Sequence, residues 1–165
     1  MRSSLEFGSG YSARIAVPFA VIGVRTRGER LVGLEYLPPG AATLAPIDAL
    51  SREVSRQLKA FIKDAHFRFD LPHEIHGTDF QRNVWERVSM IPGGRTQSYG
   101  EIARAIKTSA RAVGTCCGAN RLPLLIPCHR VVAAHGIGGF MHTRSEGTAL
   151  NIKRWLLRHE GALPQ

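Results

Sequence analysis

Short helices in quick succession constrain the fold of the second half of this chain more than any other feature. Thr78 and Gln81 form a capping-box pair ahead of "FQRNVWERVSMIP", and Ser98 and Glu101 form a second pair ahead of "YGEIARAI". Residues 92–94, Pro-Gly-Gly, end the first of these helices. An apolar face is expected on that helix, made of Phe80, Val84, Val88 and Ile91. A third helix, within "ARAVGTCCGAN", follows the brief turn "KTS". Three short helices with tight connections are therefore predicted.

The last two of these helices have the outline of a helix-turn-helix, in which the second helix enters a DNA groove. That second helix opens at Thr108 or Ser109 and carries Arg111. Its other residues are small: Ala112, Gly114, Thr115, Gly118 and Ala119. Small side chains let a backbone approach DNA closely but read few bases, so binding without strong sequence choice is expected. An ordinary helical hairpin fits the same pattern equally well.

The first half of the chain predicts a small α/β unit. Residues 13–37 are rich in β-branched residues and turn at residues 26–28, which indicates a hairpin with Pro18 at an edge position or a bulge. Helical spacing of apolar residues predicts an amphipathic helix within 47–65, and "HFRFDLP" could form another short strand. Residues 1–10 resemble a cloning remnant or a disordered start.

The expected fold class is therefore α/β (α+β) with two domains. A small N-terminal α/β scaffold domain spans 1–76, and a mainly helical domain that contains the helix-turn-helix spans 77–165. With 165 residues, of which 44% are hydrophobic, the chain can bury a core in each domain.

Charge is unevenly distributed between these halves. The net charge is +9; residues 1–77 carry 10 Lys and Arg against 8 Asp and Glu, and residues 78–165 carry 12 against 5. The basic second half favours a nucleic-acid partner. No run of eighteen apolar residues and no signal peptide are seen, so we expect a cytoplasmic protein without a membrane partner.

Reactive side chains are concentrated in "LLIPCHRVV", where Cys128, His129 and Arg130 interrupt two apolar segments. A thiol beside an imidazole can act as a nucleophile, and Pro127 favours the turn that would bring the two side chains together. A metal site is a weaker alternative, because Cys116, Cys117 and Cys128 match no zinc spacing. A cysteine protease would need a remote His with an oriented Asn or Asp, which the sequence does not single out.

The residues around this motif resemble a known family. "IPCHRVV", with "RAVGTCCGAN" and "GTDFQRNVWERVSMIPGGRTQSYGEIA" ahead of it, is closely similar to the O6-alkylguanine-DNA alkyltransferases, over about residues 77–161. The resemblance implies a repair protein that binds duplex DNA through the minor groove and flips an alkylated guanine into a pocket. It then transfers the alkyl group irreversibly to its own cysteine, once per molecule and without a cofactor or metal. O4-alkylthymine is expected to be a weaker substrate.

The family's catalytic residues map onto five positions. Cys128 is the acceptor, His129 removes its proton through a water, and Glu160 orients the His. Asn120 links the recognition helix to the acceptor turn, and Tyr99 helps to protonate N3 of the leaving guanine. Each has a simple structural alternative, such as a helix cap for Asn120 or an ion pair of Glu160 with Arg158.

The same resemblance implies two further groups of residues. The expected DNA contacts are Arg111, which fills the space left in the stack, with Ala112, Thr115, Gly118, Arg121 and Arg130. The expected substrate pocket comprises Tyr99, Val131, Phe140 and Met141. We expect a monomer, with cooperative binding along DNA left open. Structural roles are expected for Cys116 and Cys117.

Two segments depart from the family pattern. The turn "KTS" is shorter than the Gly- or Pro-bearing turn usual in the family, which puts the helix-turn-helix angle and DNA affinity in doubt. Phe140 stands where a tyrosine is usual, and the loop that follows, with His142, Thr143, Arg144 and Ser145, is longer. This loop is expected to alter the range of alkyl groups accepted. A lesion binder without catalysis is the rival function, but such proteins lack the acceptor cysteine. A regulator that senses alkylation would need a further DNA-binding module.

Overall fold

The structure is a computed structural model that describes residues 10–141 and 147–164. The chain forms two compact units, Met1–Ile75 and His76–Gln165. Residues 1–9, which were expected to be a cloning remnant or a disordered start, lie outside the described residues, and so do residues 142–146 of the loop after Phe140. In the described residues, no helix is long and apolar enough to cross a membrane.

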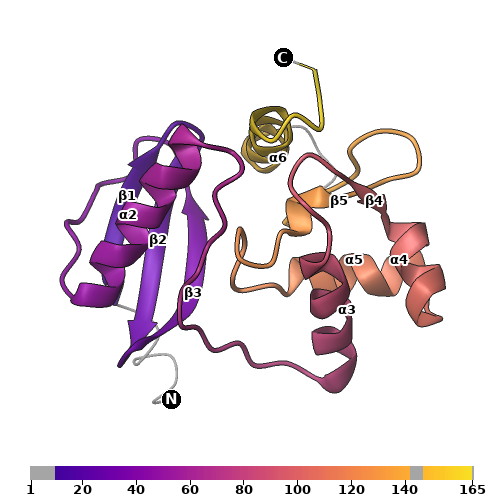
Figure 1. The fold of residues 1–165 in the computed structure, drawn as a ribbon, viewed down its shortest axis with the longest axis horizontal. Coiled ribbons are helices and arrows are strands. Elements are labelled where there is room, and N and C mark those ends of the chain that lie inside the picture. Colours follow the sequence, from indigo (N-terminus) through magenta and orange to yellow (C-terminus); the bar gives the residue numbers. More distant parts are fainter. Residues whose placement is uncertain (1–9, 142–146, 165) are drawn as a thin grey trace. The chain divides into compact units, whose positions relative to one another are not determined.

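A three-stranded antiparallel sheet, in the order β1-β2-β3, forms the first unit (Figure 1). Its strands are β1 (Ala13–Val17), β2 (Ala20–Arg27) and β3 (Arg30–Leu37). Two-residue loops join them, and Gly28 has the positive φ of 58° that a tight hairpin favours. The predicted hairpin is confirmed, but the position predicted for Pro18 is wrong. Pro18 lies in the loop between β1 and β2, where its fixed φ suits a turn and its missing N–H breaks no ladder.

Helix α2 (Ala49–Lys63) packs on this sheet, as predicted for 47–65. Its buried face includes Val54, Leu58 and Phe61. The prediction of a strand in "HFRFDLP" is wrong. The amide of the buried Gln57 donates to the carbonyl of Asp70 at 2.8 Å and accepts from its N–H at 2.9 Å. A side chain thus satisfies the backbone groups that a neighbouring strand would otherwise bind.

The second unit opens with helix α3 (Asp79–Ser89), capped by the predicted Thr78–Gln81 box. Its buried face is Val84, Trp85 and Val88, and the Trp85 indole donates to the carbonyl of Cys116 at 2.9 Å. Phe80 is 41% exposed, so its place in the predicted apolar face is wrong. Trp85, the residue after Val84, supplies the large buried ring of this helix instead. It makes the contact with helix α5 (Ala110–Gly118).

Helices α4 (Tyr99–Ile106) and α5 (Ala110–Gly118) form the predicted helix-turn-helix. The Ser98–Glu101 capping box opens α4, and Ser109 caps α5 by accepting from the N–H of Ala112. Between the helices, Lys107 adopts the left-handed conformation, φ 59° and ψ 54°. This is the position at a helix end where glycine is usually found. The short turn is thus closed by a lysine in a conformation that costs an L-residue free energy.

The unit also contains three small elements: strand β4 (Gln97–Ser98), the 3-10 helix η1 (Cys128–Arg130) and strand β5 (Val131–Val132). Gln97 pairs with Val131 and Ser98 with Val132, in parallel. The start of α4 is thereby held beside η1, although about thirty residues separate them in sequence. Helix α6 (Thr148–His159) follows and contacts η1.

Replacing Lys107 by glycine should raise the free energy of unfolding by about 1 kcal/mol, because glycine adopts the left-handed conformation without steric cost. The same change at Lys59, an exposed residue inside α2, should lower it by about 1 kcal/mol. Urea unfolding of both variants checks the pair. A loss of stability in Lys107→Gly would show that the left-handed turn is not the native one.

Candidate active site

The sequence Pro-Cys-His-Arg forms a single tight turn between two buried residues. The N–H of Cys128 donates to the carbonyl of Ile126 at 2.8 Å, and the N–H of Arg130 donates to the carbonyl of Pro127 at 2.9 Å. Cys128 is 5% exposed and His129 2%. The predicted turn at Pro127 is confirmed as the 3-10 helix η1, which curls the chain so that adjacent residues can face different parts of one site.

Glu160, which follows α6, joins two residues of this turn. Its Oε1 lies 2.9 Å from Nε2 of His129 and accepts from Nε of Arg130 at 3.1 Å, and its Oε2 accepts from Nη2 of Arg130 at 2.6 Å. Arg130 also donates through Nη1 to the carbonyl of Ile91 at 2.8 Å. The carboxylate side chain is fully buried. The pairing with His129 that the resemblance implies is therefore present, and the alternative pairing with Arg158 is not seen for Glu160.

Burial alone would raise the pKa of Glu160, but the hydrogen bonds from His129 and Arg130 outweigh it and lower the pKa to about 2. Burial lowers the pKa of His129, against the opposing effect of Glu160. The imidazole is thus neutral and the carboxylate ionised. Because an ionised carboxylate only accepts, the single imidazole proton sits on Nε2 and leaves Nδ1 as the basic nitrogen.

Asn120 lies two residues after α5 and connects that helix to the turn. Its Nδ2 donates to the carbonyl of Ile126 at 2.9 Å and to Sγ of Cys128 at 3.4 Å, while its Oδ1 accepts from the N–H of Leu122. The alternative reading of Asn120 as a left-handed helix cap is wrong, since Ala119 is the cap. The amide thus lies between helix α5 and the sulfur of Cys128.

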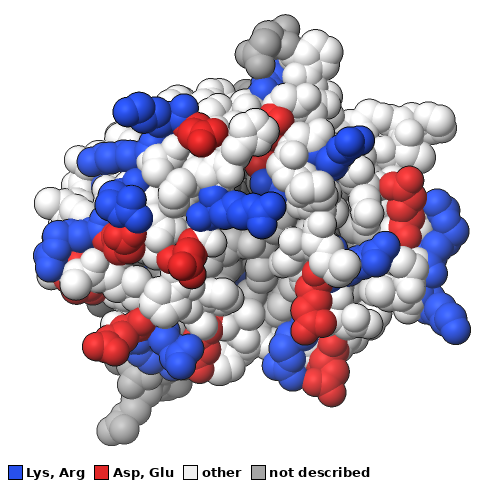
Figure 2. Space-filling model, viewed as in Figure 1, with Lys and Arg blue, Asp and Glu red and all other residues white. Residues whose placement is uncertain are grey.

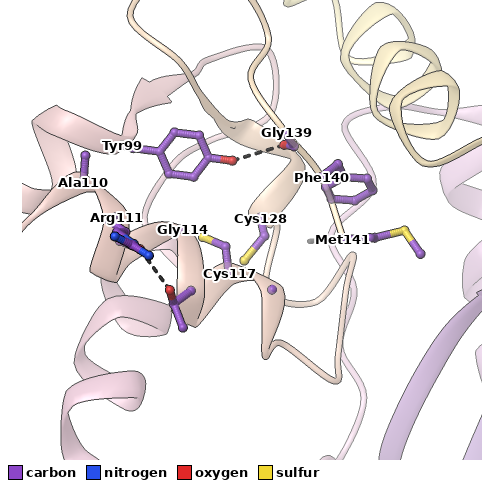
Figure 3. Close-up of a pocket in the computed structure, with 11 residues that line it drawn as sticks. Tyr99, Ala110, Arg111, Gly114, Cys117, Cys128, Gly139, Phe140 and Met141 are labelled. Atoms are coloured by element: carbon purple, nitrogen blue, oxygen red, sulfur yellow. Dashed lines mark hydrogen bonds between the residues drawn. The ribbon is translucent and has the colours of Figure 1, made fainter. Parts of the chain in front are cut away.

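A pocket of about 600 Å³ opens above Cys128 (Figure 3). This volume is typical of sites for small organic molecules. Side chains from α4, α5, the turn and the loop after β5 line it: Tyr99, Ala110, Arg111, Gly114, Thr115, Cys117, Gly118, Cys128, Gly139, Phe140 and Met141. One wall is therefore the second helix of the helix-turn-helix, and the two aromatic rings come from other elements.

Tyr99 is placed by the β4–β5 pair, because it directly follows Ser98. Its hydroxyl donates to the carbonyl of Gly139 at 3.2 Å (Figure 3). Gly138 has a φ of 74°, and a Cβ there would lie 3.1 Å from Cε2 of Tyr99. A glycine at 138 therefore allows the loop to approach the ring closely.

Lys153 is a site residue that the sequence did not single out. It is fully buried in α6, and its Nζ donates to the carbonyls of Val131 at 2.6 Å and Gly139 at 2.9 Å. The ammonium also lies 5.7 Å from the ring centre of Tyr99 and 5.8 Å from that of Phe140. Burial lowers the pKa of Lys153 to about 8, although nearby Cys117 and Cys128 oppose the shift. A lysine at helical spacing among apolar residues gives no sequence signal for this role.

Cys117 is the second residue that was missed. Cys116 is buried in the core, whereas Cys117 lines the pocket beside Cys128 (Figure 3). The structural role expected for both cysteines did not foresee this position of Cys117. The neighbouring Cys117 and burial raise the pKa of Cys128 well above its usual range, while Asn120 and Lys153 act in the opposite direction. Cys128 therefore rests as a thiol.

Several residues expected at the site lie elsewhere. Val131 has a fully buried side chain and does not line the pocket, because only its carbonyl faces the site, toward Lys153. The guanidinium of Arg130 donates to the carboxylate of Glu160 and to the carbonyl of Ile91. The structure thus shows internal contacts for a residue that was predicted to contact DNA. Ala112 and Arg121, which were predicted to contact DNA and not the base, lie outside the pocket lining, and their DNA contacts stay a prediction.

The loop residues His142, Thr143, Arg144 and Ser145 lie outside the described residues. Within residues 10–141 and 147–164, no group of three His, Cys, Asp or Glu is placed to hold a metal ion. Basic side chains also do not gather into one continuous patch on the face in Figure 2, where Lys and Arg alternate with Asp and Glu over the part of the chain described.

Replacing Glu160 by glutamine should cost about 3 kcal/mol of unfolding free energy near pH 7, from a pKa shift between 4.5 and about 2. Because the folded-state pKa is depressed, this contribution is present above pH 4.5 and lost as the pH falls toward 2. The difference between wild type and variant should therefore shrink over that window. Denaturant unfolding at several pH values measures it.

Glu53 is the matched control, since its pKa is also lowered to about 2, chiefly by hydrogen bonds from Arg56, but in an exposed pair on α2. Glu53→Gln should change stability little, because solvent screens such pairs. A pH-independent effect of Glu160→Gln would contradict the assignment of a buried carboxylate.

Comparison with known proteins agrees with this geometry. Residues 79–162 match the family described as "6-O-methylguanine DNA methyltransferase, DNA binding domain". The chain is 38% identical over 120 residues to the methylated-DNA–protein-cysteine methyltransferase of Archaeoglobus fulgidus, covering 73% of this chain and 82% of that protein. The crystal structure of Mycobacterium tuberculosis O6-methylguanine methyltransferase superposes with a TM-score of 0.72 at 33% identity, over 92% of each chain. A structure of the M. tuberculosis protein in complex with DNA gives a TM-score of 0.69 at 34% identity, over 90% of this chain and 91% of that one. The chain belongs to the 6-O-methylguanine DNA methyltransferase family, in which the relatives compared are named methylated-DNA–protein-cysteine methyltransferases.

Proposed function

We propose that this methyltransferase repairs O6-alkylguanine in duplex DNA by moving the alkyl group to Cys128. The observation that carries the proposal is the position of the thiol in a pocket whose wall is α5 of the helix-turn-helix. A pocket of about 600 Å³ suits one base and not a duplex, so the damaged base must leave the stack to reach the sulfur. Of the described residues of the N-terminal unit, none lines this pocket, and we assign that unit the role of a scaffold.

The proton of Cys128 passes to His129 in this mechanism. Nδ1 is the basic nitrogen of the imidazole, because Nε2–H donates to Glu160. A water carries the proton between the sulfur and Nδ1. The buried carboxylate of Glu160 then stabilises the imidazolium that forms, as expected for an ionised group held by Arg130 as well. The high pKa of the resting thiol makes this base necessary.

The thiolate attacks the alkyl carbon and forms a carbon–sulfur bond, while the bond between that carbon and O6 breaks. The electron pair of the broken bond goes to the guanine, whose N3 takes a proton from the hydroxyl of Tyr99. In the empty pocket that hydroxyl donates to the carbonyl of Gly139, and it would turn to N3 of the guanine once the base is bound. The proton held by His129 returns to Tyr99, and the balance is thiol plus alkylguanine giving thioether plus guanine. The thioether has no easy reverse step, so each molecule acts once.

DNA contacts follow from the exposed side of α5. Arg111, the second residue of the helix, lies at the pocket edge and takes the place of the flipped base in the stack. Because Ala110, Gly114 and Gly118 have little or no side chain, they let helix α5 come close to the sugar–phosphate backbone that borders the minor groove. The protein acts as a monomer on this view, and O4-alkylthymine is a weaker substrate because its smaller ring fills less of the pocket.

Intact mass spectrometry after incubation with a duplex carrying O6-methylguanine tests the acceptor. The protein should gain one methyl group, mapped to Cys128, and Cys128→Ser should gain none. Cys116→Ala is the matched control, since Cys116 lies outside the pocket. It should still accept the methyl group. An unchanged wild-type mass with the duplex bound would instead support lesion recognition without repair.

Replacing Arg111 by alanine should slow transfer from duplex DNA by about tenfold or more, because the gap in the stack is left unfilled. The effect should be much smaller on a single-stranded oligonucleotide with the same lesion, where no base pair is broken. Single-turnover rates at saturating protein measure both.

Arg121→Ala provides the comparison, because Arg121 is exposed and lies outside the pocket. If Arg121 contacts a phosphate, its loss should weaken binding to all duplexes and reduce the salt slope by about one, without slowing the bound-state reaction. An equal Arg111→Ala effect on duplex and single strand would contradict the role in base flipping.

A further inference from the structure

The transfer mechanism leaves one reactive group of the pocket unused, the thiol of Cys117. Adjacent residues of a helix point about 100° apart, so only one cysteine of the pair at 116–117 can face the pocket. Cys116 points into the core and is 3% exposed, whereas Cys117 is half-buried and lines the pocket wall. Figure 3 shows its side chain beside that of Cys128.

The two sulfurs therefore meet the main requirements for a thiol–disulfide pair. They come from different elements, α5 and η1, and their side chains lie side by side at one pocket (Figure 3), as a disulfide demands. Both line the same open pocket, so a small oxidant can reach them when no base is bound. Lys153, fully buried nearby, provides positive charge that favours the formation of a thiolate at this place.

We propose that Cys117 and Cys128 form a reversible disulfide when a peroxide enters the empty pocket. His129 takes the proton of Cys128, and the resulting thiolate attacks the peroxide, whose O–O bond breaks. Cys128 becomes a sulfenic acid, and the released oxygen takes the proton back from His129 and leaves as an alcohol or water. The sulfur of Cys117 then displaces hydroxide from this sulfenic acid, which takes up the thiol proton and leaves as water. Two thiols are thus oxidised by two electrons and one peroxide is reduced. A dithiol reverses the bond by exchange.

Cys117 acts here as a resolving thiol that protects the acceptor. A sulfenic acid without a neighbouring thiol proceeds to sulfinic acid, which a dithiol cannot reduce. With Cys117 beside it, the first oxidation product is captured as a disulfide instead. While the disulfide is closed, Cys128 cannot accept an alkyl group, a consequence that rests on the proposed function. The cross-link itself does not depend on it.

The experiment treats the full-length protein with hydrogen peroxide, blocks free thiols and maps tryptic peptides without reduction. Cleavage at Arg111, Arg121 and Arg130 separates Cys116 and Cys117, in residues 112–121, from Cys128, in residues 122–130. We expect a cross-link between these two peptides in wild type and in Cys116→Ala, and none in Cys117→Ala. No cross-link in wild type, or a cross-link that survives in Cys117→Ala, would overturn the proposal.

Recovery of methyl uptake gives the second readout, with each variant compared with its own untreated sample. After peroxide and then dithiothreitol, wild type and Cys116→Ala should regain methyl uptake, and Cys117→Ala should remain inactive with a sulfinic acid at Cys128. Equal recovery in all three would contradict a resolving role. A cross-link in a protein that never accepts a methyl group would refute the proposed function alone, and methyl uptake without a cross-link would refute the disulfide alone.

Discussion

The buried carboxylate of Glu160 is the interaction on which the rest of the site depends. It accepts hydrogen bonds from His129 and Arg130, which are neighbours in sequence, and so fixes the middle and the end of the short turn η1. Removing one partner of such a group leaves an uncompensated charge inside the protein, which costs far more than a surface pair. Cys128 precedes these two residues, so the position of the sulfur is set by a charge at the end of α6. Fold stability and chemistry thus share one contact.

A second set of contacts holds the pocket around that turn. The β4–β5 pair places Tyr99 beside the turn, and the ammonium of Lys153 ties the carbonyl of Val131 to that of Gly139. Since Gly139 also accepts from Tyr99, one carbonyl oxygen joins the aromatic wall, the loop and α6. The pocket is thereby built from four distant segments, none of which forms a binding site alone.

Local signals in the sequence predicted the fold where local physics decides it. The capping boxes at Thr78 and Ser98 are satisfied within four residues, and both helices begin where expected. The strand predicted in residues 66–72 failed because Gln57, thirteen residues from Asp70, supplies the hydrogen bonds. Lys153 and Cys117 were missed for the same reason, since their partners are set by tertiary packing. The resemblance led to Cys128, His129, Glu160 and Asn120, which periodicity alone could not bring together.

The raised pKa of Cys128 has a consequence for the unused protein. On the proposed mechanism this sulfur reacts only once, so a stray alkylating agent that reaches it would use up the molecule, and thiolates react with such agents far more readily than thiols do. Burial and the neighbouring Cys117 favour the protonated sulfur while the pocket is empty. The environment that calls for a base such as His129 would therefore also lengthen the working life of each molecule between encounters with damaged DNA.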